Sequence, residues 1–237
     1  MLEQYRIDDI LFLDIETVPQ EKSFDDVNET MQELWDKKSK YFRKEDESPA
    51  DVYQRAGIYA EFGKIVCISI GGIQNGEGGK KFWSHSFAGA DEKKLLDEFA
   101  EVLNKPKNKN KYLCGHNIKE FDVPFIARRM LINGIKLPDA LNIAGKKPWE
   151  VNFIDTLDLW KFGDYKHYTS LNLLTNIFGI PSPKDDIDGS EVARVFYEEN
   201  DIERIAAYCE KDVLATAQLF LRFKGESLIN PANVERV

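Results

Sequence analysis

Residues 10–17 read ILFLDIET, a short apolar run that carries two acidic residues and ends just before Pro19. Its β-compatible residues predict a strand. Because side chains alternate between the two faces of a strand, Asp14 and Glu16 project from the same side, among apolar neighbours. Two like charges in a buried place repel each other and are poorly solvated, and a hard divalent ion with oxygen ligands would compensate them. In the alternative, the strand ends early and water solvates the pair.

Two further acidic residues stand in apolar surroundings. Asp122 follows GHNIKEF (residues 115–121) and precedes an apolar helix, where an N-cap aspartate is by far the better interpretation of this residue taken singly. Asp212 lies in YCEKDVLAT (residues 208–216), four residues after Tyr208, so the two share one face of the predicted terminal helix. The alternative for Asp212 is a solvated charge at the edge of the apolar stripe. Asp155 and Asp158 lie in the predicted fifth strand, and we do not assign them as ligands.

The rest of the chain places these residues in an α/β fold. Periodicity predicts strands over 10–17, 64–74, 80–87, 112–116 and 151–159, and helices over 91–104, 122–132, 171–178, 190–199 and 202–224. This order favours a mixed five-stranded sheet flanked by helices, with three mostly antiparallel strands first and parallel strands after them. We expect a single domain over residues 1–237, with residues 20–62 as a helical insertion after the first strand. The insertion would pack beside the cleft and shape the substrate channel, or equally serve as a scaffold element or a partner surface.

Composition narrows the class of protein. The chain has 237 residues, of which 43% are hydrophobic and 31% charged, as in ordinary folded proteins. Apolar runs stay below the ~18 residues of a membrane span, so no membrane association is expected. We expect no secretory signal, and the three dispersed cysteines argue against a zinc knuckle or a disulfide framework, which indicates the cytoplasm. The net charge of −9 speaks against a protein that coats duplex nucleic acid, but not against an enzyme with a metal-filled acidic site.

The four carboxylates can converge in this topology, and around two magnesium ions they suit phosphodiester hydrolysis. The ordered motifs Asp14-x-Glu16, Asn117 to Asp122 and Tyr208-xxx-Asp212 resemble the tyrosine subclass of the DEDD superfamily of 3′–5′ exonucleases, which has a ribonuclease H-like fold. LFLDIETVP, EFGKIVCISIGG, GHNIKEFDVPFI and YCEKDVLAT look like the proofreading domain of family-B DNA polymerases. Over essentially the whole chain the resemblance is greatest to stand-alone bacterial proteins described as predicted 3′–5′ exonucleases related to that domain.

The resemblance implies a role for each catalytic residue. Asp14 would bridge two Mg²⁺ or Mn²⁺ ions, Glu16 and Asp212 would hold the ion that carries the nucleophilic water, and Asp122 would support the second ion. Tyr208 would hydrogen-bond that water, as an orienting group rather than a base, because an unperturbed tyrosine pKa is about 10.

The resemblance also implies residues that contact the substrate. Asn117 would contact the terminal nucleotide, Phe121 would stack on or wedge beside a base, and Ile15 and Thr17 would meet the 3′ end. The segment after the predicted fifth strand emerges at the same end of the sheet, and phosphate contacts or a plain surface loop are both open for Trp160, Lys161, Lys166, His167 and Tyr168. By contrast, the lysine-rich residues 105–111 read as a solvated turn at the opposite end.

These observations favour a metal-dependent 3′–5′ exonuclease that acts on single-stranded DNA and releases nucleoside 5′-monophosphates. An exoribonuclease with the same carboxylates is one alternative, and a catalytically silent nucleic-acid-binding or polymerase-associated module is another. A polymerase or repair partner, the pathway and the oligomeric state are left open. Polymerase motifs are absent from the sequence, so coupling to synthesis is not implied.

Overall fold

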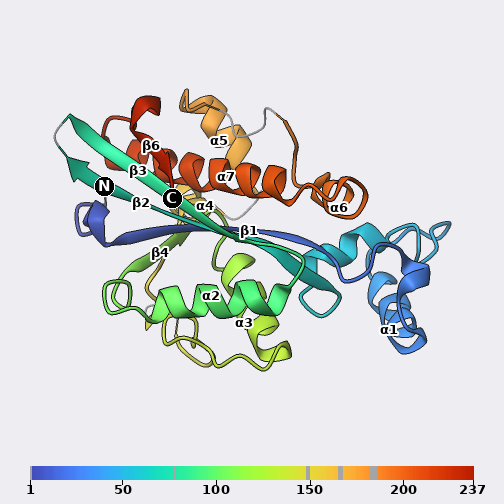
Figure 1. Ribbon diagram of the computed structural model, residues 1–237. Helices are drawn as coiled ribbons and strands as arrows, with labels where there is room; N and C mark the ends of the chain where they lie inside the picture. Colours follow the sequence, from blue (N-terminus) through green and yellow to red (C-terminus); the bar gives the residue numbers. More distant parts are fainter. Residues whose placement is uncertain (1, 77, 148–149, 165–167, 182–185) are drawn as a thin grey trace.

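A mixed β-sheet forms the centre of the molecule, with helices on both of its faces (Figure 1). The computed structural model describes residues 2–76, 78–147, 150–164, 168–181 and 186–237. Within these ranges the sheet has six strands in the order β5-β4-β1-β2-β3-β6. They are β1 (Ile10–Pro19), β2 (Gly63–Gly76), β3 (Gly79–Ala88), β4 (Tyr112–Gly115), β5 (Phe153–Asp155) and β6 (Val234–Arg236).

The strand directions agree with the predicted topology. β1, β2 and β3 are antiparallel neighbours, whereas β4 runs parallel to β1 and β5 runs parallel to β4. The helices are α1 (Glu29–Ser39), α2 (Glu92–Asn104), α3 (Asp122–Ile132), α4 (Thr156–Lys161), α5 (Leu171–Ile177), α6 (Val192–Arg194) and α7 (Ile202–Lys224). The α/β class with a mixed sheet flanked by helices is therefore confirmed.

Two details differ from the prediction. The sheet has a sixth strand, β6, which pairs in parallel with β3 over three residues, too few to produce a recognisable alternation in the sequence. The strand predicted over 151–159 is wrong beyond Asp155, where the chain turns into α4. The physical reason is a helix cap, because the Asp155 carboxylate accepts a hydrogen bond from the Leu157 backbone N–H at 2.9 Å.

Alternation along β1 decides which way its acids point. Leu11, Leu13 and Ile15 belong to the core cluster under α2 and α3, whereas Ile10 and Phe12 pack with the α7 side. Asp14 and Glu16 continue the second set, so they face α7. In Figure 1, α7 crosses one face of the sheet while α2 and α3 cover the other.

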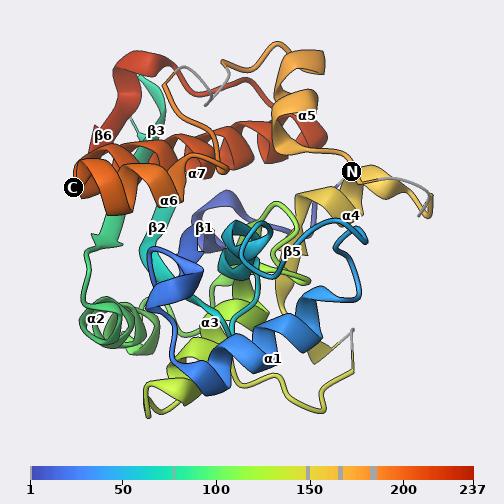
Figure 2. The same cartoon turned by 90° about the vertical axis from the view of Figure 1, so that its right-hand side faces the viewer.

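The segment 20–62 lies at the end of β1 that carries the acids (Figure 2). It contains α1 and two short 3-10 helices, Phe24–Asp26 and Tyr53–Ile58, around the fully buried Trp35. The second 3-10 helix approaches β1 closely, because a Cβ on Gly57 would stand 3.2 Å from Pro19. A hydrogen bond of 2.9 Å from the Gln20 N–H to the Phe62 carbonyl closes the segment. Among the described residues, no helix is long and apolar enough to cross a membrane.

Candidate active site

The acids named by the sequence come together where β1, α3 and α7 meet. Asp14, Asp122, Tyr208 and Asp212 line one cleft of about 410 Å³, together with Ile15, Asn117 and Phe121. Glu16 and Thr17 line an adjoining groove of about 440 Å³. Ile15 and Phe121 border both hollows, so all nine residues predicted for the site line one or both of these neighbouring hollows.

The electrostatic environment of the acids is unfavourable to their charged forms. Burial, followed by the Asp212 and Asp122 carboxylates, holds the pKa of Asp14 well above its usual range. Burial and then Asp14 do the same for the pKa of Glu16. Burial raises the pKa of Asp122 to about 7, although its own N–H and that of Ile15 donate to the carboxylate and oppose the rise. The charged groups that act most strongly on these acids are thus other acids, as in a site built for a cation.

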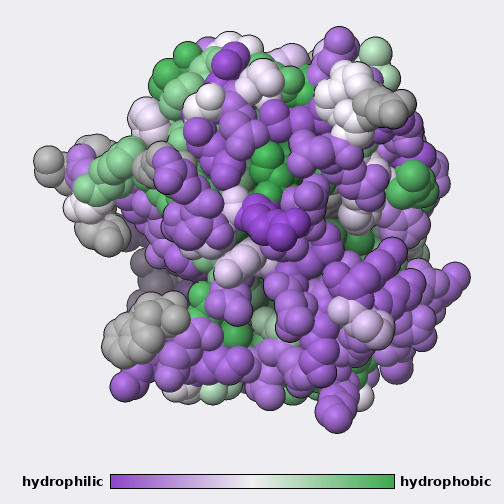
Figure 3. Space-filling view, turned by 90° about the vertical axis from the view of Figure 1, so that its left-hand side faces the viewer, coloured by the Kyte–Doolittle hydropathy of each residue, from purple (hydrophilic) through white to green (hydrophobic). Residues whose placement is uncertain are grey.

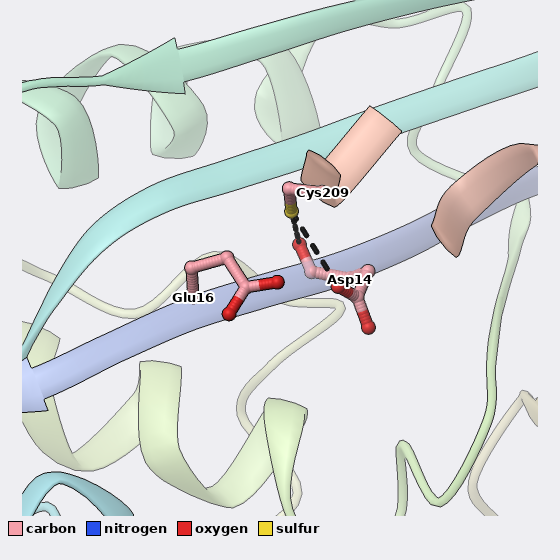
Figure 4. A group of neighbouring side chains, drawn as sticks. All are labelled: Asp14, Glu16 and Cys209. Carbon is pink, nitrogen blue, oxygen red and sulfur yellow. Dashed lines mark hydrogen bonds between the residues drawn. The ribbon is translucent and has the colours of Figure 1, made fainter. Parts of the chain in front are cut away.

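Figure 4 shows Asp14 and Glu16 on β1 with Cys209 of α7 beside them. One carboxylate oxygen of each acid and the Cys209 Sγ lie within 4.8 Å of one another. The thiol donates to the Asp14 backbone carbonyl at 3.4 Å and to its Oδ2 at 3.5 Å, and burial raises its pKa. In this arrangement the thiol acts as a hydrogen-bond donor to Asp14, and the other candidate ligands are carboxylate oxygens. That donor set fits a hard divalent cation such as Mg²⁺ or Mn²⁺ and does not favour zinc.

Tyr208 stands on α7 over these acids. Its side chain is 7% exposed and hydrogen-bonds the Asp212 carboxylate one helical turn further on. Burial, with Asp212 and Glu16 nearby, raises the pKa of Tyr208 far above its usual value. The phenol therefore keeps its proton at neutral pH and acts as a hydrogen-bond donor.

Of the residues considered for phosphate contacts, the structure brings Tyr168 to the site. It lines the carboxylate cleft. Burial raises the pKa of Tyr168, and the nearby Asp122 and Asp14 raise it further. Lys161 instead contacts Asp158 at 3.4 Å, and Trp160 stacks on Phe223 beneath α5. Lys166 and His167 lie outside the described residues.

Sequence reasoning missed the contribution of Asp155. Its carboxylate, 3% exposed, accepts the backbone N–H groups of Asn117 at 2.9 Å and Lys119 at 3.1 Å, in addition to that of Leu157. These bonds fix the loop between β4 and α3, in which Asn117 has a positive φ of 68°. An aspartate before an apolar helical turn is an N-cap signal, so the sequence could have identified the bond to Leu157 at the start of α4. The bond between Asp155 and Asn117 joins residues 38 positions apart in the sequence, and no local pattern signals it.

Similarity to known proteins agrees with this geometry. A family described as "Predicted 3'-5' exonuclease related to the exonuclease domain of PolB" matches residues 58–228. The match includes Asp122, Tyr208 and Asp212 but begins after Asp14 and Glu16. No curated protein matches the chain.

Among solved structures, the family B DNA polymerase from the hyperthermophilic archaeon Pyrobaculum calidifontis is similar, with a TM-score of 0.52 and 15% identity over 90% of this chain. The chain spans 24% of that polymerase, and at this identity the likeness shows the fold alone, in agreement with a ribonuclease H-like sheet. Because the family match extends over well more than half of the chain, the protein belongs to the predicted 3′–5′ exonucleases related to the exonuclease domain of PolB.

Proposed function

We propose that the protein is a divalent-metal-dependent exonuclease that hydrolyses the phosphodiester bond at the 3′ end of single-stranded DNA and releases nucleoside 5′-monophosphates. The observation that carries this proposal is the convergence of Asp14, Asp122, Tyr208 and Asp212 in one cleft, with Glu16 in the adjoining groove. Membership of the exonuclease family supports the reaction type and its direction.

The acids divide the metal ligation among them. Asp14 interacts electrostatically with Glu16 as well as with the acids of α3 and α7, so it would be shared by two ions. Glu16 and Asp212 would complete one site and Asp122 the other. When bound, the two ions supply a nucleophilic water and stabilise the charge that develops on the attacking and leaving oxygens. The raised pKa values of Asp14, Glu16 and Asp122 fall on binding, because a cation favours the charged carboxylates.

The remaining residues position the substrate and the water. Tyr208, protonated at neutral pH, donates a hydrogen bond that orients the attacking water rather than removing its proton. Phe121 borders both hollows, so its ring can stack beside the base next to the scissile bond. Asn117 would contact the terminal nucleotide, and Ile15 and Thr17 its 3′ end.

The groove beside Glu16 supports removal of one nucleotide at a time. One of its walls is the 3-10 helix Tyr53–Ile58 of segment 20–62, which contributes Gln54, Arg55, Gly57 and Ile58. A groove of about 440 Å³ lies in the range of small-ligand pockets and suits one nucleoside. In this proposal segment 20–62 is an insertion within a single domain, and it stops the strand one nucleoside beyond the scissile bond.

Matched single-stranded DNA and RNA oligomers, labelled at the 5′ end and incubated with and without Mg²⁺, test the proposal. We expect a ladder that shortens from the 3′ end on DNA for the natural chain and for Asp158→Asn, a matched surface control. Asp14→Asn should reduce the ladder to background while the fold persists, because it removes a shared ligand and no core volume. Faster shortening of RNA would assign the enzyme to RNA. No ladder on either substrate with Mg²⁺ or Mn²⁺ would refute turnover and favour a silent binding module.

A further inference from the structure

A separate hollow lies toward the other end of the sheet from the acids. The hairpin of β2 and β3 is long, with 14 residues in β2, whereas α2 beneath it has 13. A strand of that length spans roughly 45 Å and the helix roughly 20 Å, so α2 leaves the end of the hairpin uncovered. The cavity formed there measures about 700 Å³ and is bordered by the loop that follows α2. We call it the hairpin hollow; its lining includes Gly72, Trp83, His85, Lys105, Lys107 and Lys111.

One wall of the hairpin hollow is aromatic. Trp83 and His85 lie two residues apart on β3 and therefore face the same side of the sheet. Gly72 is the partner of Trp83 across the strand pair, and a Cβ there would stand 2.8 Å from the indole Nε1. The glycine thus lets the indole lie against the backbone of β2. The His85 ring is held by a hydrogen bond of 2.6 Å between its Nδ1 and the Val237 carbonyl.

The opposite wall is cationic. In the loop after α2, the Asn108 side chain donates to the Val102 carbonyl at 2.9 Å and its N–H donates to the Lys105 carbonyl at 2.8 Å, which fixes the turn. Lys111 donates to the Asp8 carbonyl at 2.7 Å. Burial lowers the pKa of Lys111 and Lys107 adds to that shift, whereas Asp9 and Asp8, the latter also in the lining, oppose it. Lys105 and Lys107 are exposed, and the described part of the chain shows no ion pair for either.

Lys109, in the same loop, is placed differently. It pairs with Asp139 at 3.3 Å and lines another hollow on the far side of the loop. The molecule is mostly hydrophilic at this end, with a few apolar patches (Figure 3). The sequence predicts a solvated turn for this run of lysines, but in the structure the run has two sides, and one of them lines the same hollow as Trp83.

We propose that the hairpin hollow is a second nucleotide-binding site, which takes a nucleoside phosphate with its base against Trp83 and its phosphate at Lys105 and Lys107. Stacking on an aromatic side chain tolerates any base, and lysine is a common phosphate ligand. An acidic peptide would use the lysines but not the indole, so the paired walls favour a nucleotide.

The hairpin hollow is separate from the active site. It lies on the α2 face of the sheet, near the residues that precede β1, whereas Asp14 lies in the middle of that strand and faces α7 on the other side of the sheet. The ligand has two possible sources, a distal segment of a bound strand or a free nucleoside monophosphate. Both ligands are anions, which a chain of net charge −9 repels, and at this position the lysines would offset that repulsion.

Equilibrium binding in chelator, where a metal-dependent nuclease does not cut its ligand, tests the site. The probes are thymidine 5′-monophosphate and fluorescent oligothymidylates of about 4 and about 16 nucleotides, the span of site sizes in single-strand-binding folds. The variants are K105E/K107E, Trp83→Ala and, as the matched control, Lys109→Glu in the same loop. Circular dichroism and thermal unfolding verify that each variant is folded.

We expect K105E/K107E to weaken binding by about tenfold or more and to flatten its salt dependence. Trp83→Ala should weaken it by roughly 5-fold to 100-fold, the range of one stacked base. Lys109→Glu should change it by less than about 2-fold, because its charge lies outside the hollow. Saturation by the monophosphate would identify a free nucleotide as ligand, and binding of oligomers alone would identify a strand segment. The proposal is overturned if no probe binds, or if Lys109→Glu weakens binding as much as K105E/K107E.

Discussion

The carboxylate of Asp155 offers a direct test of how the active-site loop is held. Its Oδ1 accepts the N–H groups of Asn117 and Leu157, and its Oδ2 accepts that of Lys119. In Asp155→Asn the amide oxygen can retain the first two bonds, but an NH₂ group then faces the Lys119 N–H. In Asp155→Ala all three backbone donors lose their partner in a buried place.

The magnitude follows from these bonds. A hydrogen bond to a charged acceptor contributes about 1.5–3 kcal/mol, and a buried donor left without a partner costs a similar amount. We therefore expect Asp155→Asn to lower the free energy of unfolding by about 2 kcal/mol. Asp155→Ala should lower it by about 4 kcal/mol, less than three full bonds because the losses share one relaxing loop. The same loop carries Asn117 and Phe121 and leads into Asp122, and a shift of about 1 Å there can slow hydrolysis by about 100-fold.

Urea unfolding in chelator and initial rates on single-stranded DNA measure the two effects. Asp158→Asn is the matched control, because Asp158 contacts Lys119 through an exposed side-chain ion pair at 3.1 Å. That change should cost less than about 1 kcal/mol. If Asp155→Asn equals the control in both stability and rate, Asp155 does not hold the loop and this reasoning is refuted.

Two further predictions concern the acids and the tyrosine. Tyr208→Phe should slow hydrolysis by roughly 10-fold to 100-fold, because it removes a hydrogen-bond donor. Metal binding, measured by calorimetry, should not weaken, because the phenol is no ligand. An unchanged rate would show that the phenol has no part in the mechanism. Asp122 has a pKa of about 7 in the fold, against about 3.9 unfolded, so in chelator the native state holds its proton more tightly and this stabilisation is lost as pH rises through 7. Asp122→Asn should match the natural chain in unfolding free energy near pH 4 and exceed it above pH 7 by up to roughly 4 kcal/mol. Added Mg²⁺ should narrow this difference. An equal difference at both pH values would contradict the raised pKa of Asp122.

Local periodicity accounts for what the sequence could predict. The alternation of β1 places Asp14 and Glu16 on one face, and the spacing of four places Tyr208 and Asp212 on one side of α7, as the structure has them. These relations depend on the geometry of single elements, which a few neighbouring residues determine. The alternation of helices and strands likewise predicts the mixed sheet, since few topologies satisfy the rules for crossover connections.

Tertiary packing decided the rest. That the acids of β1 meet Asp122 and Asp212 in one cleft depends on how α3 and α7 pack against the sheet, and no local pattern encodes that distance. The end of β5 is set by the Asp155 carboxylate, whose partners include residues in the loop after β4. The hairpin hollow exists because α2 is shorter than β2 above it, and the loop after α2 lines the space that α2 leaves open. A sequence determines the faces of its own helices and strands, whereas the side chains that meet between those elements depend on long-range packing, which only the folded chain specifies.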